Sequence, residues 1–116
     1  MKGYAIGLLQ DVQMGPEIVE YLERIDATLE PYGGRFLIHG GQAEVVEGTS
    51  PGAVIVIEFP DPDRAAGWYA SPAYQEILPL RTRNTRSTAF LIDGVDPDHR
   101  ATDVLAPPST DVNSAA

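Results

Sequence analysis

Four short apolar segments of the chain have the length and composition of β-strands. Ala53–Phe59 (AVIVIEF) is the richest in β-branched residues, which favour strands. Glycine, proline and aspartate cluster near the ends of the segments, as is typical of turns. A weak alternation of apolar and polar residues over Ala43–Glu47 predicts a short extension of the sheet. The main predicted strands are Tyr4–Leu9, Arg35–His39, Ala53–Phe59 and Thr88–Ile92.

Between the first two predicted strands, apolar residues recur with the spacing of an amphipathic helix. Pro16 is suited to a first helical turn, where the missing N–H costs nothing. Pro31 and the Gly33-Gly34 pair predict its end. The apolar face of this helix consists of Ile18, Leu22, Ile25 and Leu29.

A second helical region follows Phe59 and contains two start signals. Asp61-Pro62 and Ser71-Pro72 each place a capping side chain directly before a proline at the first helical position. The helix is therefore expected to break and restart at Ser71. We expect Pro79 to limit the second piece, because proline removes a helical hydrogen bond.

The predicted order is strand, helix, strand, strand, helix, strand, which is the βαββαβ order of ferredoxin-like folds. The fold class is therefore α+β, with a four-stranded antiparallel sheet. Ala5–Leu9, Val54–Ile57 and Ala89–Ile92 are apolar at consecutive positions, so both faces of the sheet are apolar. Two helical regions cover only one face. We therefore expect a homodimer, in which the second face packs against a second copy.

Composition limits the partners that the protein can have. The chain of 116 residues carries 17 acidic and 8 basic residues, a formal net charge of -9, and a single lysine. This charge repels nucleic-acid phosphates and anionic membrane surfaces, so neither is expected as a partner. The absence of cysteine excludes disulfides and thiolate metal sites. Without a signal-peptide pattern, a cytoplasmic location is expected.

The last part of the chain differs in character from the rest. Residues 1–94 carry the predicted elements, whereas residues 95–116 are rich in Asp, Pro, Ser and Ala and have no periodicity. We expect one domain followed by an extended or disordered tail, mobile beyond about Pro107. Val104-Leu105 has two interpretations, as a docking segment for a partner subunit or as part of a plain disordered tail.

His39 is the best single acid–base candidate. It is one of two histidines, and the other, His99, is in the tail. Imidazole side chains titrate near pH ~6.5, which suits proton transfer at neutral pH. By strand alternation His39 is expected on the same face as Arg35 and Leu37. A structural, hydrogen-bonded histidine is the alternative.

Glu58 and Arg81 have two interpretations. A carboxylate at the end of an apolar strand is costly unless it is paired, and Arg81 is a suitable partner. The structural interpretation is a Glu58–Arg81 ion pair that ties helix to sheet. In the functional interpretation Glu58 is a catalytic base, or Arg81 binds a substrate carboxylate through its planar fork.

Trp68, Tyr69 and Tyr74 form an aromatic cluster at helical spacing. The cluster is expected either as core or as the wall of a site for a planar ligand. Ser71 lies within this candidate substrate-binding segment, and its simplest role is an N-cap. No metal-ligand spacing, P-loop or dinucleotide fingerprint is present in the sequence, so no metal or cofactor is expected.

These residues resemble a known bacterial family. The similarity covers roughly residues 2–94 and is carried mainly by the WYxSPxY run of residues 68–74 and the EF end of the strand before it. The chain resembles the domain-of-unknown-function family thirteen-thirty, in the dimeric α/β-barrel superfamily of ferredoxin-like folds. The resemblance implies a homodimer with a cleft between sheet and helices in each subunit. The other matching residues are Tyr32, Gly33, Gly34, Arg35, Gly41, Glu47, Gly48 and Arg81.

Two functions are compatible with these features. The first is a cofactor-independent enzyme, of isomerase, cyclase or monooxygenase type, acting on a small and partly aromatic molecule. The convergence of polar and aromatic residues on a cleft-forming fold motivates it; the resemblance adds superfamily relatives that include cofactor-independent monooxygenases, although fold alone does not transfer chemistry. The second is a non-catalytic dimeric module that binds a metabolite or another protein.

Overall fold

A computed structural model describes residues 1–105 of the chain. The elements follow the predicted βαββαβ order, with the second helical region divided in two. The strands are β1 (Gly3–Gln10), β2 (Arg35–His39), β3 (Ala53–Phe59) and β4 (Arg86–Asp93), and the α-helices are α1 (Pro16–Leu29), α2 (Pro62–Ala70) and α3 (Pro72–Thr82). Short 3₁₀ helices occupy Glu30–Tyr32 (η1) and Ala101–Leu105 (η2).

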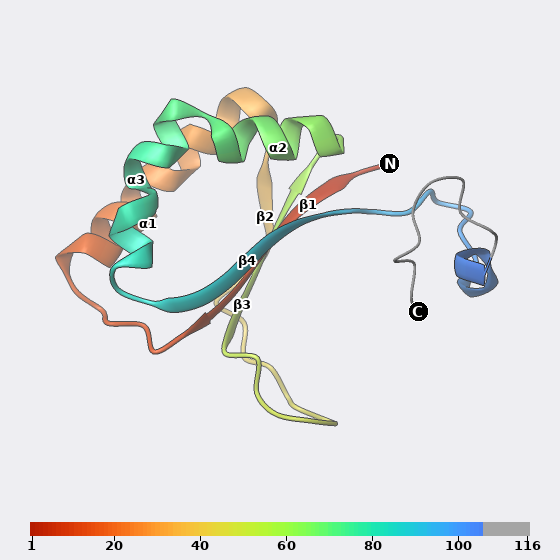
Figure 1. The fold of residues 1–116 in the computed structure, drawn as a ribbon, viewed down its shortest axis with the longest axis horizontal. Helices are drawn as coiled ribbons and strands as arrows, with labels where there is room; N and C mark the ends of the chain where they lie inside the picture. The colour runs from red at the N-terminus through yellow and green to blue at the C-terminus, as the bar shows by residue number, and fades with distance from the viewer. Residues whose placement is uncertain (106–116) are drawn as a thin grey trace.

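The four strands form one antiparallel sheet in the order β2-β3-β1-β4. The two central strands, β3 and β1, are therefore not consecutive in the chain, as in ferredoxin-like folds. The predicted fold class is confirmed: an α+β, ferredoxin-like sheet with its helices on one face (Figure 1).

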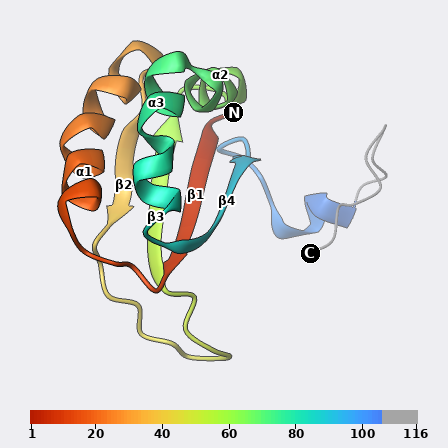
Figure 2. The ribbon, with the colours of Figure 1, turned by 60° about the vertical axis from the view of Figure 1, so that its left-hand side comes forward.

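The helical layer covers one face of the sheet, and α1 and α3 lie side by side over it (Figure 2). Apolar residues at helical spacing in α1 are buried against the sheet, including Ile18, Ile25 and Leu29. The core continues through Phe59 and Ile77, which are fully buried. The helix face predicted from the sequence therefore faces the core, except that Leu22 remains partly exposed.

The two predicted capping residues act as expected. The Asp61 carboxylate accepts a hydrogen bond from the Arg64 backbone N–H at 2.8 Å, and the Ser71 hydroxyl accepts one from the Tyr74 N–H at 3.2 Å. The expected end of the helix at Pro79 is wrong, because α3 continues to Thr82. Tyr74, Ile77 and Arg81 are buried along one face of α3, and this packing outweighs the cost of an internal proline.

Strand β2 contains a β-bulge that the sequence did not predict. Phe36 pairs with Ile57, whereas the next paired residue, Ile38, faces Val56, so Leu37 is an extra residue in the strand. The bulge reverses the alternation after Leu37. The expected common face of Arg35, Leu37 and His39 is therefore wrong, because His39 lies on the helix-covered face and Arg35 on the other.

Two connecting segments also differ from expectation. Residues 43–47 form no strand and belong to a long loop, 40–52, which extends beyond the end of the sheet (Figure 1). Residues 95–105 lead away from the helices on the uncovered side of the sheet and contain η2. The expected mobility beyond about Pro107 concerns residues outside the described part of the chain.

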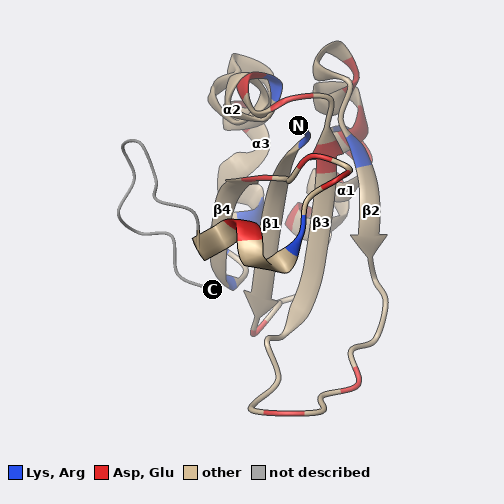
Figure 3. Cartoon of the chain, turned by 90° about the vertical axis from the view of Figure 1, so that its right-hand side faces the viewer, with Lys and Arg blue, Asp and Glu red and all other residues tan. Residues whose placement is uncertain are grey.

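The second face of the sheet is apolar and uncovered in the single chain. Its central side chains come from Ile6 and Leu8 of β1, Val56 of β3, and Phe90 of β4, which is 42% exposed. Charged residues are sparse along these strands in Figure 3. None of the helices within residues 1–105 combines the length and apolar character needed to cross a membrane.

Candidate functional site

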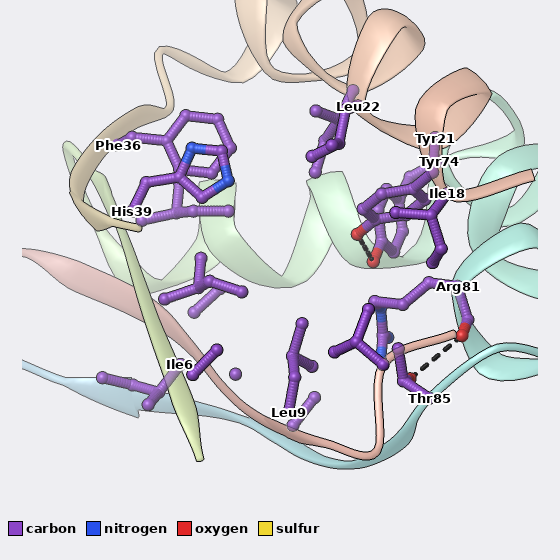
Figure 4. Close-up of a pocket in the computed structure, with 18 of the residues that line it drawn as sticks. Ile6, Leu9, Ile18, Tyr21, Leu22, Phe36, His39, Tyr74, Arg81 and Thr85 are labelled. Atoms are coloured by element: carbon purple, nitrogen blue, oxygen red, sulfur yellow. Dashed lines mark hydrogen bonds between the residues drawn. The ribbon is translucent and has the colours of Figure 1, made fainter. Parts of the chain in front are cut away.

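A cavity of about 460 Å³ lies between the helices and the covered face of the sheet (Figure 4). Most of its lining is apolar. Helix α1 contributes Ile18, Leu22 and Ile25, and the strands contribute the floor. Polar side chains are concentrated at its two ends. Cavities of this size and character are typical of sites for small organic molecules.

Small residues in the middle of the sheet create the cavity. Gly7 of β1 pairs with Ala89 of β4 on one side and with Ile55 of β3 on the other. A side chain at Gly7 would have its Cβ no closer than 3.8 Å to any neighbouring atom, so the space above the glycine is open. The large side chains of Tyr21, Trp68 and Tyr74 are buried in the core beneath the helices, and all three also line the cavity.

One end of the cavity contains Arg81 and two tyrosines. The hydroxyl oxygens of Tyr21 and Tyr74 are 2.7 Å apart and hydrogen-bonded. The Arg81 side chain is 7% exposed, and its Nη1 donates to the Ser87 hydroxyl at 2.6 Å. The Arg81 guanidinium carbon lies 5.9 Å from the centre of the Tyr21 ring, within cation–π range.

Tyr21 is the main site residue missing from the sequence-based candidates. Burial, together with the neighbouring Tyr74, raises the pKa of Tyr21 well above its usual value, so its phenol is neutral at physiological pH. A signal for it was present, because Tyr21 lies three residues after Ile18 and four before Ile25 and therefore shares their helix face.

The opposite end of the cavity contains His39. Its imidazole stacks on the Phe36 ring, with 4.4 Å between ring centroids and 17° between planes. Figure 4 shows this pair far from the tyrosines and Arg81, across the apolar middle of the cavity. His39 is exposed and the bulge in β2 directs it to the cavity. The expectation that His39 lines the cleft agrees with this placement.

The aromatic cluster is both core and cavity wall. Trp68 and Tyr74 are buried in the core, whereas Tyr69 is partly exposed, and all three line the cavity. The Trp68 indole N–H donates to the Thr28 hydroxyl at 2.9 Å, which fixes the ring. The two interpretations of this cluster are therefore compatible.

Glu58 lies away from the cavity, on the uncovered face of the sheet. Its carboxylate accepts hydrogen bonds from Arg35 at 3.0 and 3.1 Å and from the Tyr4 hydroxyl at 3.2 Å. Desolvation raises the pKa of Glu58, but these hydrogen bonds outweigh it, and the pKa falls below its usual value. The expected Glu58–Arg81 ion pair is wrong, because the two side chains lie on opposite faces of the sheet.

Ser71 has a structural position. Its hydroxyl caps α3 and also donates to the Trp68 carbonyl at 2.7 Å, and the side chain does not line the cavity. The two residues of the predicted site that the structure does not bring to the cavity are thus Glu58 and Ser71. Within residues 1–105, no group of three His, Asp or Glu side chains is arranged to hold a metal ion.

The sequence as a whole matches a known family. Residues 2–95 match the family described as Domain of unknown function (DUF1330). The chain belongs to the DUF1330 family. This membership confirms the resemblance inferred from the WYxSPxY run and the strand before it. No curated protein matches the chain.

Solved structures with the same fold include proteins of unknown and of described function. A protein of unknown function from Rhodopseudomonas palustris has a TM-score of 0.63 and 16% identity, over 83% of this chain and 84% of its own. A dimeric ferredoxin-like protein of unknown function from Jannaschia sp. CCS1 has a TM-score of 0.55 and 12% identity. The match covers 81% of this chain and 100% of that protein's chain. At these identities the similarity concerns the fold alone.

One structural neighbour has a described activity. SnoaB from Streptomyces nogalater, a cofactor-independent oxygenase, has a TM-score of 0.51 and 16% identity, covering 82% of this chain and 92% of its own. The ferredoxin-like fold of this DUF1330 protein is thus shared with at least one enzyme.

Proposed function

We propose that this protein is a cofactor-independent enzyme, of isomerase, cyclase or monooxygenase type, that acts on a small, partly aromatic organic molecule. The observation that carries the proposal is the cavity of about 460 Å³, apolar in the middle and polar at both ends. Such a site binds an apolar body and orients it through a few polar contacts. The fold shared with a cofactor-independent oxygenase is compatible with this proposal.

The lining residues suggest specific roles. His39 is the proton carrier, because it is the cavity-lining side chain best suited to proton transfer near neutral pH. Trp68, Tyr69 and Tyr74 form the wall against which a planar substrate stacks. Arg81 orients the substrate from the far end. Glu58 has no role in this proposal because it lies on the other face of the sheet.

We also propose that the protein functions as a homodimer. The uncovered face of the sheet is apolar at its centre, and such a surface is costly to leave in water. A structural neighbour with the same fold is described as dimeric. A second copy, packed sheet against sheet, would cover both exposed faces at once.

The catalytic role of His39 is tested by comparing two histidine variants. A panel of phenols, enols and small lactones is screened with the full chain, following oxygen uptake and ultraviolet absorbance. We expect His39→Ala to lower kcat by about 100-fold or more for the substrate found, the usual contribution of a general acid or base. His99→Ala, at an exposed position outside the cavity, is the matched control and should leave kcat unchanged.

Equal loss of activity in both variants, or none in His39→Ala, would contradict the assignment of His39. Binding of panel compounds in the cavity without any turnover would favour the second function, a non-catalytic module that binds a metabolite. The position of His39 far from Arg81 and the tyrosines is the observation that supports this alternative, since the two ends share no proton-transfer contact.

A further inference from the structure

Arg81 is a buried cation without a counter-charge in the described part of the chain. The neighbours of its guanidinium there are neutral: Ser87, which accepts a hydrogen bond from Nη1, and the phenols of Tyr21 and Tyr74. No carboxylate of residues 1–105 lies within 4.0 Å of its guanidinium. Burying an unpaired charge is costly, and arginine does not lose its proton to avoid the cost.

The other arginines between residues 24 and 86 are placed differently. Their side chains are at least 41% exposed, and each has a carboxylate within 4.0 Å: Arg24, Arg35, Arg64, Arg83 and Arg86. The chain carries 17 acidic residues, so potential partners are abundant. The most buried arginine thus has no anion within 4.0 Å in the described part of the chain.

The hydroxyl pair beside Arg81 supplies a further donor. Two hydroxyls joined by one hydrogen bond use one of their two protons, and the second proton remains available. Within residues 1–105, neither hydroxyl donates a hydrogen bond to any other side chain or to the backbone. Arg81 adds the N–H groups that Ser87 does not accept. This end of the cavity therefore offers hydrogen-bond donors in excess of acceptors.

The rest of the cavity excludes a small hydrated ion as the natural ligand. Its middle is lined by the apolar residues Leu9, Ile18, Ile25 and Ala89. Among residues 1–105, no side chain fills the space directly above Gly7. An occupant that fills this volume needs an apolar body, since polar groups there would find no partner. Figure 4 shows Arg81 and the tyrosines at one side of this apolar space.

We propose that the cavity binds an aromatic or alicyclic carboxylate, with its charged group at Arg81 and the Tyr21–Tyr74 hydroxyls and its ring above Gly7. This inference rests on the proposed function and adds to it the chemical class of the ligand. The planar guanidinium matches the two oxygens of a carboxylate, and the resulting hydrogen bonds are stronger than neutral ones. The carboxylate of the ligand would thus be the counter-charge that Arg81 lacks within residues 1–105.

A matched pair of probes tests the proposal. Isothermal titration calorimetry of the full chain at pH 7.5 compares 2-naphthoate with 2-naphthamide, which has the same shape but no charge. We expect the wild type to bind the carboxylate at least about 10-fold more tightly. In Arg81→Met, binding of 2-naphthoate should weaken by about 10- to 100-fold, the range for a buried hydrogen bond to a charged group, while binding of 2-naphthamide stays nearly unchanged.

Two further variants make the result independent of folding defects. Arg83→Met removes the same charge from an exposed position two residues away and should leave the affinities for both probes unchanged. Tyr74→Phe keeps the buried ring and removes its hydroxyl, and it should weaken 2-naphthoate binding by about 3- to 10-fold. If Arg81→Met does not fold, Tyr74→Phe decides the question.

Several outcomes would overturn the proposal. Equal affinity of the wild type for both probes, or undiminished binding of 2-naphthoate by Arg81→Met or Tyr74→Phe, would disprove recognition of the anion and leave the small-molecule site intact. Failure of both probes to bind the wild type would reject the cavity as a site for aromatic molecules, and the proposed function with it.

Discussion

Gly7 shows how one residue determines the shape of the site. Glycine in a strand costs about 0.5–1 kcal/mol relative to alanine, because it loses more backbone freedom on folding. Here its lack of a side chain leaves open space over the centre of the sheet, between Ile55 and Ala89. The cavity therefore depends on a residue that no stability argument would favour.

We expect Gly7→Leu to fill the cavity and abolish ligand binding without unfolding the protein. The new side chain enters space where the nearest atom is 3.8 Å from its Cβ, so the change should alter stability by less than about 1 kcal/mol. Calorimetry with 2-naphthamide and urea denaturation measure the two effects. Gly41→Leu, at an open loop position, is the control and should bind normally. Unchanged binding by Gly7→Leu would place the ligand elsewhere.

Tyr21 and Arg81 illustrate a second point at the residue scale. Tyr21 belongs to a helix whose apolar periodicity is visible in the sequence, so its burial was predictable. Arg81 lies beyond Pro79, where the helix was expected to end, so its place on the buried face of α3 did not follow from that prediction. What the sequence could not indicate is that they meet each other. They come from α1 and α3, and the packing of these two helices brings the Tyr21 and Tyr74 hydroxyls within 2.7 Å.

At the scale of elements, the β-bulge in β2 has the largest consequence for function. Simple alternation placed His39 beside Arg35, on what is now the uncovered face. One extra residue, Leu37, moves His39 to the cavity and leaves Arg35 to pair with Glu58. Bulges have weak sequence signals, because they depend on how two strands pair and not on either strand alone.

Glu17, near the start of α1, links this helix to the residues that directly follow α3. Its carboxylate accepts hydrogen bonds from Arg83 Nη2 at 2.6 Å and from Asn84 Nδ2 at 2.8 Å. These bonds lower the pKa of Glu17 below its usual value. A group with a lowered pKa in the folded state stabilises the fold above its unfolded pKa, and the stabilisation disappears as the pH falls through its folded pKa.

We therefore expect Glu17→Gln to destabilise the protein at pH 7 and to have little effect at pH 2.5. The wild type should lose the contribution of Glu17 as the pH falls below about 4.3, the usual value for glutamate. Urea denaturation at a series of pH values measures the difference. Glu23→Gln, on the exposed side of α1, is the control. A loss of stability from Glu17→Gln that is the same at both pH values would contradict this interpretation.

At the scale of the whole molecule, the two faces of the sheet have different roles. The covered face carries the cavity, whereas the other face is apolar at its centre and bordered by the Glu58–Arg35 pair at one end and Arg86–Asp11 at the other. An apolar centre with a charged border is the usual composition of a protein interface. This arrangement supports the proposed homodimer.

Phe90→Glu tests the homodimer. Light scattering at micromolar concentration should give the wild type twice the 12.5 kDa mass of the chain. The variant should be monomeric, because a carboxylate would be buried without a partner in the centre of the interface. Val19→Glu, on the exposed side of α1, is the control and should remain dimeric. A monomeric wild type, or a dimeric Phe90→Glu, would show that this face is not the interface.

Local chemistry explains why most of the fold was predictable from the sequence. The strands Arg35–His39 and Ala53–Phe59 match β2 and β3 in their bounds, and Asp61 and Ser71 cap the helices that they were expected to cap. These features depend on residues within one or two turns of each other. Pro79 was misleading because the buried face of α3 continues past it, and burial is not a local property.

The sequence by itself determined the type and order of the main elements, the buried face of α1 and the apolar character of both sheet faces, because period, capping and composition are properties of neighbouring residues. Only the tertiary structure decided that His39 faces the cavity, that Glu58 pairs with Arg35, and that Arg81 meets Tyr21 and Tyr74. Each of these depends on strand register or helix packing, which join residues far apart in the chain.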